Sequence, residues 1–157
     1  MQKITPFFFF DNNAEEAVEF YTSIFPESSI TSRSYYPEGS PGPVGQLMTA
    51  SFTLHGQEFI ALNGCVQFKF TEAISFTVDC ESQEEVDYYW DKLVEGGKPS
   101  QCGWLKDKFG LSWQIVPRAL GELMSDPDPE KSGRTMQAML KMVKLDVQTL
   151  RDAYDGK

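Results

Sequence analysis

The segment Glu72–Pro117 constrains the fold of this chain more than any other part. It opens with the alternating run ISFTVDC, typical of a half-buried strand, and continues with Gln83–Leu93, whose apolar residues recur at helical spacing. Gly96 and Gly97 end that helix. Three short strands are expected after it, near Lys98–Cys102, Trp104–Lys106 and Leu111–Val116. The segment therefore predicts a strand, a helix and three further strands, the last two joined by a turn at Asp107–Gly110.

The first half of the chain repeats this order of elements. A short apolar run, ITPFFFF, precedes AEEAVEFYTSIF, a helical pattern that Asp11 or Asn12 can cap and that Pro26 ends. A strand over Ser28–Tyr36 and a loop rich in glycine and proline come next. The run LMTASFTLHGQEFIALNG then predicts a hairpin with its turn near His55–Gly56. The two halves share element order but little sequence, so we expect an α+β fold in which a structural duplication forms a paired sheet.

Residues after Pro117 carry helical patterns only. Asp128 followed by Pro129 predicts a helix start, because it supplies a capping oxygen and a proline in the first turn. An apolar stripe follows, made of Met136, Met139, Leu140 and Val143, and continued after a break near Lys144–Asp146 by Val147, Leu150 and Tyr154. This stripe favours packing onto the domain or onto a partner subunit over a cofactor site. We expect a homodimer, and the stripe leaves open whether the helices cross to the partner.

The domain organisation follows from these patterns. We expect one domain over residues 1–117, with modules at about 1–66 and 67–117, and a helical extension over 118–157 that belongs to the same domain.

The acidic composition limits the partners of the protein. With 23 acidic and 14 basic residues among 157, the net charge is −9, which argues against nucleic acid and anionic membranes. A cationic or neutral small ligand suits this charge better. No apolar run approaches the roughly 18 to 20 residues that span a bilayer. The N-terminal run is too short for a signal peptide, so we expect a cytoplasmic protein.

The chain offers few residues for nucleophilic or metal chemistry. Its three cysteines contain no CxxC pair; Cys80 is expected to be a half-buried thiol, whereas Cys102, beside a Gly-Trp turn, is a candidate catalytic residue. His55 is the only histidine and is expected to be a solvated turn residue. The run Asp126–Glu130 is expected to start a helix, because Lys131 replaces the glycine that a calcium loop requires.

Five stretches of the chain resemble a known family. They are ITPFFFFDNNAEEAVEFYTSIFP, SFTLHGQEFIALNG, FKFTEAISFTVDCESQEEVDYYWDKLVEGG, QCGWLKDKFGLSWQIVP and SDPDPEKSGRTMQAMLKMVKLDVQTLRDAYDG. The first four resemble the PhnB-like branch of the vicinal oxygen chelate superfamily, which includes glyoxalase I, bleomycin-resistance proteins and extradiol dioxygenases. The last resembles the C-terminal extension of that branch, which is often labelled 3-demethylubiquinone-9 3-methyltransferase. The resemblance implies two β-α-β-β-β modules forming a cupped mixed sheet, a fold that hosts many reactions.

In metal-using members of the superfamily, the ligands come from the first and fourth strands of each module. Carried over to this chain, those positions hold Pro6, Ala61, Ala73 or Ser75, and Gln114. None is a histidine or a carboxylate, whereas a catalytic divalent ion typically takes about three protein nitrogen or oxygen donors. We therefore expect no metal and no cofactor.

Period-two alternation selects the side chains expected to line the cup. The candidates for ligand binding are Phe8, Phe59, Asn63, Ser75, Trp104, Ser112 and Gln114. The two amides, Asn63 and Gln114, would orient a small, partly aromatic molecule, and the rings would provide stacking area. Catalytic residues stay unknown, with Gln114 and Cys102 as candidates.

Three functions from different classes fit these patterns. The first, which we expect, is a metal-free small-molecule-binding protein. The second is an enzyme, either the 3-demethylubiquinone-9 3-methyltransferase of the family label or a metal-dependent lyase or dioxygenase. A doubly wound methyltransferase needs a glycine-rich turn between a strand and a helix, but Gly39, Gly42 and Gly45 lie in a loop with no helix after it. The third is a dimeric scaffold whose own side chains fill the cup.

Overall fold

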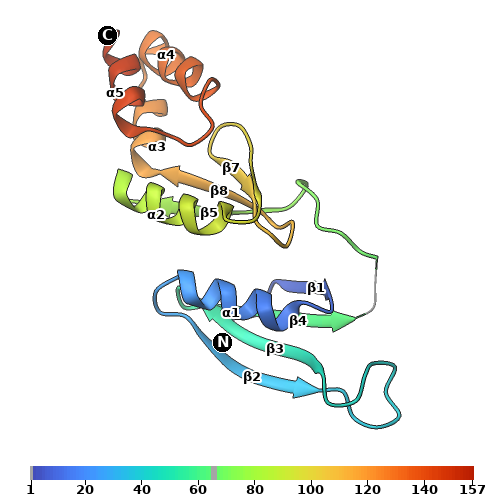
Figure 1. Cartoon of the computed structure of the whole chain (residues 1–157). Coiled ribbons are helices and arrows are strands. Elements are labelled where there is room, and N and C mark those ends of the chain that lie inside the picture. Colours follow the sequence, from blue (N-terminus) through green and yellow to red (C-terminus); the bar gives the residue numbers. More distant parts are fainter. Residues whose placement is uncertain (1, 65–66) are drawn as a thin grey trace. The chain divides into compact units, whose positions relative to one another are not determined.

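The computed structural model describes residues 2–64 and 67–157, which fold as two compact units (Figure 1). Unit 1 ends at Lys69 and unit 2 begins at Phe70. Each unit carries a mixed four-stranded sheet, and helices complete both. The predicted α+β class with a C-terminal helical extension is therefore confirmed. The division into one domain over 1–117 and its extension stays a prediction.

Unit 1 is a strand followed by a helix and three more strands. Its elements are β1 (Phe7–Asp11), α1 (Ala14–Ile24), β2 (Ser29–Tyr35), β3 (Leu47–Leu54) and β4 (Gln57–Gly64). The sheet order is β1-β4-β3-β2, with β1 parallel to β4 and the other neighbours antiparallel. The predicted hairpin turn is present: φ is positive at both His55 (48°) and Gly56 (78°), which matches the twist of paired strands.

One face of this sheet forms the core with α1. Buried side chains on that face occupy alternate strand positions: Phe8, Phe10, Ala50, Phe52, Leu54, Phe59 and Ala61. The helix contributes Ala14, Ala17, Val18, Tyr21 and Ile24. The rings of Phe52 and Phe59 stack with centroids 5.4 Å apart. The other face carries Phe9, Ile60 and Leu62, all of them partly exposed.

The N-terminus of α1 is capped from a strand distant in sequence. Asn13 occupies the cap position but makes no side-chain hydrogen bond to the helix. Instead, the Ala14 amide donates a hydrogen bond of 2.8 Å to Oδ1 of Asn63 on β4. The prediction that Asp11 or Asn12 caps the helix is therefore wrong. The cap comes from β4 because β1 and β4 pair in parallel, which places position 63 beside the end of β1.

Unit 2 repeats the order of unit 1. Its first elements are β5 (Ser75–Cys80), α2 (Gln83–Val94), β6 (Lys98–Pro99), β7 (Trp104–Lys106) and β8 (Ser112–Pro117), in the sheet order β5-β8-β7-β6. Helix α2 buries Val86, Trp90 and Leu93, as their spacing predicts.

The turn before β8 is fixed by a buried carboxylate. Asp107 is 3% exposed and accepts hydrogen bonds of 2.9 and 3.0 Å from the amides of Phe109 and Leu111. It also accepts one of 2.9 Å from Nε1 of Trp113. The aspartate-glycine signal in the sequence therefore marks a turn that is bonded into the core.

Three helices complete the described part of unit 2: α3 (Arg118–Met124), α4 (Pro129–Met139) and α5 (Val147–Asp155). Asp128 caps α4, accepting a hydrogen bond of 2.9 Å from the Glu130 amide, as predicted. The helices enclose a core of Leu120, Leu145 and Leu150, against which Val116 of β8 packs. The extension therefore packs on the sheet of its own unit.

The predicted apolar stripe of the extension is only partly buried. Met139 packs against the small core, but Met136, Leu140 and Val143 stay 43%, 51% and 40% exposed. Helix α4 ends at Met139, five residues before the predicted break. None of the described helices combines the length and the apolar character needed to cross a membrane.

Candidate functional site

Three predicted ligand-binding residues lie in the core of unit 1. Phe8 and Phe59 are each 5% exposed, with ring centroids 5.6 Å apart, and Asn63 is 6% exposed. The Asn63 side chain accepts from the Ala14 amide and donates to the Leu47 carbonyl at 3.1 Å. The sequence predicts that these side chains line the cup, but they lie on the face of the sheet that α1 covers; their role in ligand binding stays a prediction. Asn63 does border a hollow of about 570 Å³ near the start of α1, but both of its polar atoms are engaged.

The metal-ligand positions expected in the first module also miss the open face. Ala61 is fully buried beneath α1, whereas its neighbours Ile60 and Leu62 point the other way. Pro6 precedes β1, and its carbonyl accepts a hydrogen bond from the Ile60 amide. Within residues 2–64 and 67–157, no three His, Cys, Asp or Glu side chains gather closely enough to hold a metal ion.

The predicted residues of the second module share one face of their sheet. Ser75 and Ser112 are register partners on β5 and β8, and Gln114 is the partner of Trp104 on β7. Nε2 of Gln114 donates a hydrogen bond of 2.9 Å to Oγ of Ser75. Alternation along β8 places this set opposite the buried Trp113. Their common placement agrees with the alternation, and their role in binding stays a prediction. Ala73, the other candidate ligand position, lies in the turn before β5.

Ser112 is the unusual member of this face. Its side chain is 1% exposed, and its hydroxyl is the one buried side-chain group without a hydrogen-bond partner in the described part of the chain. Leaving a buried hydroxyl unpaired costs about 1–3 kcal/mol. Its register neighbours are Ser75 and Lys106, and Lys106 is held by an ion pair of 2.6 Å with Glu72. The Ser112 hydroxyl thus retains hydrogen-bonding capacity among polar neighbours.

The two described cysteines differ in exposure. Cys80 is fully buried, and desolvation raises the pKa of its thiol to about 12, so the thiol stays protonated at neutral pH. Cys102 is partly exposed at a turn with a φ of 59°, and its candidate catalytic role stays a prediction. Cys65 lies outside the described residues. His55 is exposed at the hairpin turn, as expected.

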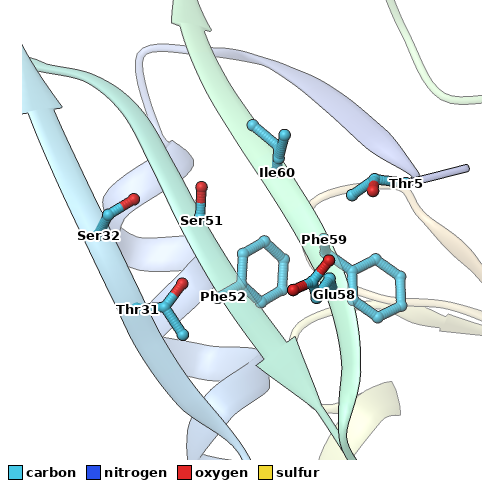
Figure 2. Close-up of a pocket in the computed structure, with 8 residues that line it drawn as sticks. All are labelled: Thr5, Thr31, Ser32, Ser51, Phe52, Glu58, Phe59 and Ile60. Carbon is cyan, nitrogen blue, oxygen red and sulfur yellow. The ribbon is translucent and has the colours of Figure 1, made fainter. Parts of the chain in front are cut away.

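A pocket of about 290 Å³ opens on the face of the unit 1 sheet that α1 leaves uncovered (Figure 2). It is lined by Thr5, Thr31, Ser32, Ser51, Phe52, Glu58, Phe59 and Ile60. Glu58 is the charged side chain in this lining, and Figure 2 labels it among the residues of the pocket. The sequence prediction missed the polar residues here, because it followed the Phe59 side of β4. The signal that could have found them is the alternation of Glu58 and Ile60 with Phe59.

Comparison with known proteins places this chain in a family. The family model described as 3-demethylubiquinone-9 3-methyltransferase matches residues 2–116. A PhnB protein from Bacillus cereus, named as a candidate 3-demethylubiquinone-9 3-methyltransferase, is 44% identical, with a TM-score of 0.69. That similarity covers 74% of this chain and 99% of the Bacillus chain. A search of curated proteins gave no match.

Two more distant structures share the fold. A Pseudomonas aeruginosa protein is 19% identical, with a TM-score of 0.62, over 74% of this chain and 98% of its own. The fosfomycin resistance protein FosX from Listeria monocytogenes is 17% identical, with a TM-score of 0.54, over 77% of this chain and 94% of its own. The fold of this chain is therefore found in proteins of very different sequence.

Proposed function

The chain belongs to the PhnB-like 3-demethylubiquinone-9 3-methyltransferase family, and from this premise we propose that it is a metal-free protein that binds a small, partly aromatic molecule. The proposed binding surface is the face of the unit 2 sheet that carries Ser75, Trp104, Ser112 and Gln114. The observation that carries this proposal is the buried Ser112 hydroxyl, which lacks a partner within the described residues. A ligand atom bonded to this hydroxyl would remove a cost of about 1–3 kcal/mol.

The neighbouring side chains indicate the chemistry of the ligand. Gln114 donates to the Ser75 oxygen, so the Ser75 hydroxyl hydrogen can be donated to a ligand oxygen. Trp104, the register partner of Gln114, is partly exposed and offers an indole face for stacking. An aromatic molecule bearing a carbonyl or hydroxyl group meets both requirements.

Metal-dependent chemistry does not fit the residues of this chain. A FosX structure from Listeria monocytogenes, 16% identical to this chain, is described as a complex with Mn(II) and sulfate. In this chain the candidate metal-ligand positions hold Pro6, Ala61, Ala73 or Ser75, and Gln114, so at most a hydroxyl and an amide could donate to a metal. Hard divalent ions favour carboxylate oxygens and borderline ions favour imidazole, and these positions offer neither ligand.

The methyl transfer named in the family description is the alternative function. The glycines Gly39, Gly42 and Gly45 lie between β2 and β3, not between a strand and a helix. The described residues therefore lack the strand, glycine turn and helix that a doubly wound methyltransferase uses for its methyl donor. The described residues therefore do not fit a methyl donor bound in that way.

We further propose that the protein acts in the cytoplasm as a homodimer. Met136, Leu140 and Val143 expose apolar side chains on and just after α4, and association with a second copy would remove them from water. Light scattering during size-exclusion chromatography tests this, with the expectation of a dimer that Leu140→Glu weakens. A monomeric wild-type protein at micromolar concentration would contradict it.

The binding proposal is tested by native mass spectrometry of the purified protein, combined with elemental analysis. If no organic mass is retained, a panel of small aromatic carbonyl compounds is screened by thermal shift and calorimetry. Ser112→Ala should weaken binding at least about tenfold, because a hydrogen bond to a buried hydroxyl is lost. Gln114→Leu should weaken it as much, because the Ser75 hydroxyl loses the donor that directs its hydrogen toward the ligand. Ser100→Ala removes an exposed hydroxyl from the turn after β6 and serves as the matched control.

Two results would contradict the binding proposal. One is stoichiometric bound metal whose removal abolishes ligand binding. The other is a panel in which no compound binds, or binding that is the same in Ser112→Ala, Gln114→Leu and Ser100→Ala.

A further inference from the structure

The pocket on the uncovered face of the unit 1 sheet combines one carboxylate with several hydroxyl groups. Glu58 contributes the charge, and Thr5, Thr31, Ser32 and Ser51 contribute the hydroxyls. Figure 2 shows that these groups come from β2, β3, β4 and the segment before β1. The pocket volume of about 290 Å³ is close to the lower end of the range for small-ligand sites, about 300 Å³.

The hydroxyls in this pocket differ from their neighbours on the same two strands. Ser29 and Thr53 lie 3.4 Å apart and Ser34 and Thr49 lie 2.5 Å apart, so these cross-strand pairs bond to each other. Ser32 and Ser51 are also register partners, yet within the described residues neither side chain makes a hydrogen bond. The unbonded hydroxyls of Ser32 and Ser51 therefore distinguish the pocket from the neighbouring parts of the two strands.

A β-bulge in β2 explains why the Ser32 and Ser51 hydroxyls do not bond to each other. The register of β2 against β3 shifts between Ile30 and Ser32, so Thr31 is an extra residue in the strand. An extra residue bends a strand and re-aims its side chains. Here the bulge places Thr31 in the pocket lining beside Ser32.

The Glu58 carboxylate is likewise unengaged. Its backbone is held by the Gln2 side chain, which exchanges two hydrogen bonds of 3.1 Å with the Glu58 amide and carbonyl. Within residues 2–64 and 67–157, the hydrogen bonds of Glu58 involve its backbone, and its carboxylate makes no hydrogen bond or ion pair. The backbone of β4 is therefore held in place at Glu58, while the Glu58 carboxylate remains available to a ligand in the pocket.

From these observations we propose that this pocket binds a small organic ammonium ion. An ammonium group has three N–H donors and no acceptor. The carboxylate of Glu58 and the hydroxyl oxygens of Ser32 and Ser51 supply the acceptors that such a group needs, and the net charge of −9 favours cations. A bare divalent metal is a poorer occupant, because Glu58 is the single carboxylate in the lining.

The test uses 1,4-diaminobutane and n-butylammonium as probes, with neutral 1-butanol as the comparison of equal chain length. Binding is measured by calorimetry and mapped by NMR on the full chain. Glu58→Gln keeps the shape of the side chain and removes its charge, so ammonium affinity should fall at least about tenfold. Ser51→Ala should lower it by a smaller factor, and shift changes should centre on β2, β3 and β4.

Glu38→Gln is the matched control, since it removes an exposed carboxylate from the loop after β2 and changes the net charge equally. Its affinity should equal that of the wild type. The proposal is overturned if 1-butanol binds as tightly as the ammonium probes, if neither ammonium probe binds, or if Glu38→Gln and Glu58→Gln weaken binding alike. The last result would show attraction by overall charge alone. These readouts involve different residues from those of the unit 2 binding surface, so either proposal can fail without the other.

Discussion

The sequence predicts that Asn63 binds a ligand, whereas its hydrogen bonds indicate a structural role. The variant Asn63→Ala tests the structural role. In the structure, Asn63 links three elements: its Oδ1 accepts from the first amide of α1, and its Nδ2 donates to the Leu47 carbonyl on β3. Asn63→Ala removes both bonds. At 6% exposure, little water can replace them. We expect this variant to lose stability in unit 1 whether or not a ligand is present.

The size of the loss follows from the two groups left unpaired. Each unsatisfied buried donor or acceptor costs about 1–3 kcal/mol, and loss of a helix N-cap alone costs about 1 kcal/mol. With incomplete relaxation, Asn63→Ala should lower the free energy of unfolding by about 2–4 kcal/mol. Asn13→Ala is the matched control, because Asn13 occupies the cap position without capping. It should cost less than about 0.5 kcal/mol, as exposed substitutions do.

The assay must report on unit 1. All three tryptophans, Trp90, Trp104 and Trp113, lie in unit 2, so fluorescence would follow the wrong unit. Hydrogen exchange measured by mass spectrometry on peptides from α1, with urea titration, reports the required free energy. The reasoning is refuted if Asn63→Ala costs less than about 0.5 kcal/mol, or if Asn13→Ala costs as much as Asn63→Ala.

Three further predictions concern unit 2. Iodoacetamide at pH 8 should modify Cys102 and leave Cys80 unmodified in the native protein, because burial raises the Cys80 pKa to about 12; rapid native labelling of Cys80 would contradict this. Asp107→Asn should lower the free energy of unfolding by about 2 kcal/mol in a urea titration followed by tryptophan fluorescence, since an amide cannot satisfy all three donors. The hydrogen bonds from Thr149 lower the pKa of the Asp146 carboxyl. The ionised carboxylate therefore stabilises the folded protein fully above the ordinary aspartate pKa, and this stabilisation is lost as the pH falls through the lowered pKa of the folded state. Asp146→Asn, which caps without titrating, should reduce this acid dependence of α5 hydrogen exchange, and an unchanged profile would argue against the assignment.

Most of the fold was predictable because its signals are local. Helix α2 follows from the spacing of Val86, Trp90 and Leu93, and α4 from the Asp128–Pro129 start. The hairpin turn at His55–Gly56 was predicted where the structure has it. Such signals depend on hydrogen bonds and side chains within a few residues. The cap of α1 could not be found in this way, because Asn63 lies 49 residues from Ala14 and reaches it only through the pairing of β1 with β4.

The face on which the candidate residues lie was predictable in unit 2 and not in unit 1. Along β8, polar Ser112 and Gln114 alternate with apolar Trp113 and Ile115, so the sequence itself indicates which set faces away from α2. Along β1, four consecutive phenylalanines give no such contrast. Alternation divides those rings into two faces but does not indicate which face the helix covers.

The sequence by itself determined the order of elements, the turns and the family, because periodicity, turn chemistry and motif residues act over short stretches of chain. Only the tertiary structure decided that α1 covers the Phe8 and Phe59 face, which leaves Glu58 and Ser51 uncovered, and that the Ser112 hydroxyl is buried without a partner among the described residues. The physical reason is that a side chain is buried only when another element packs against its face. A side chain becomes core or site according to which element packs against it, and that choice depends on contacts between residues far apart in the sequence.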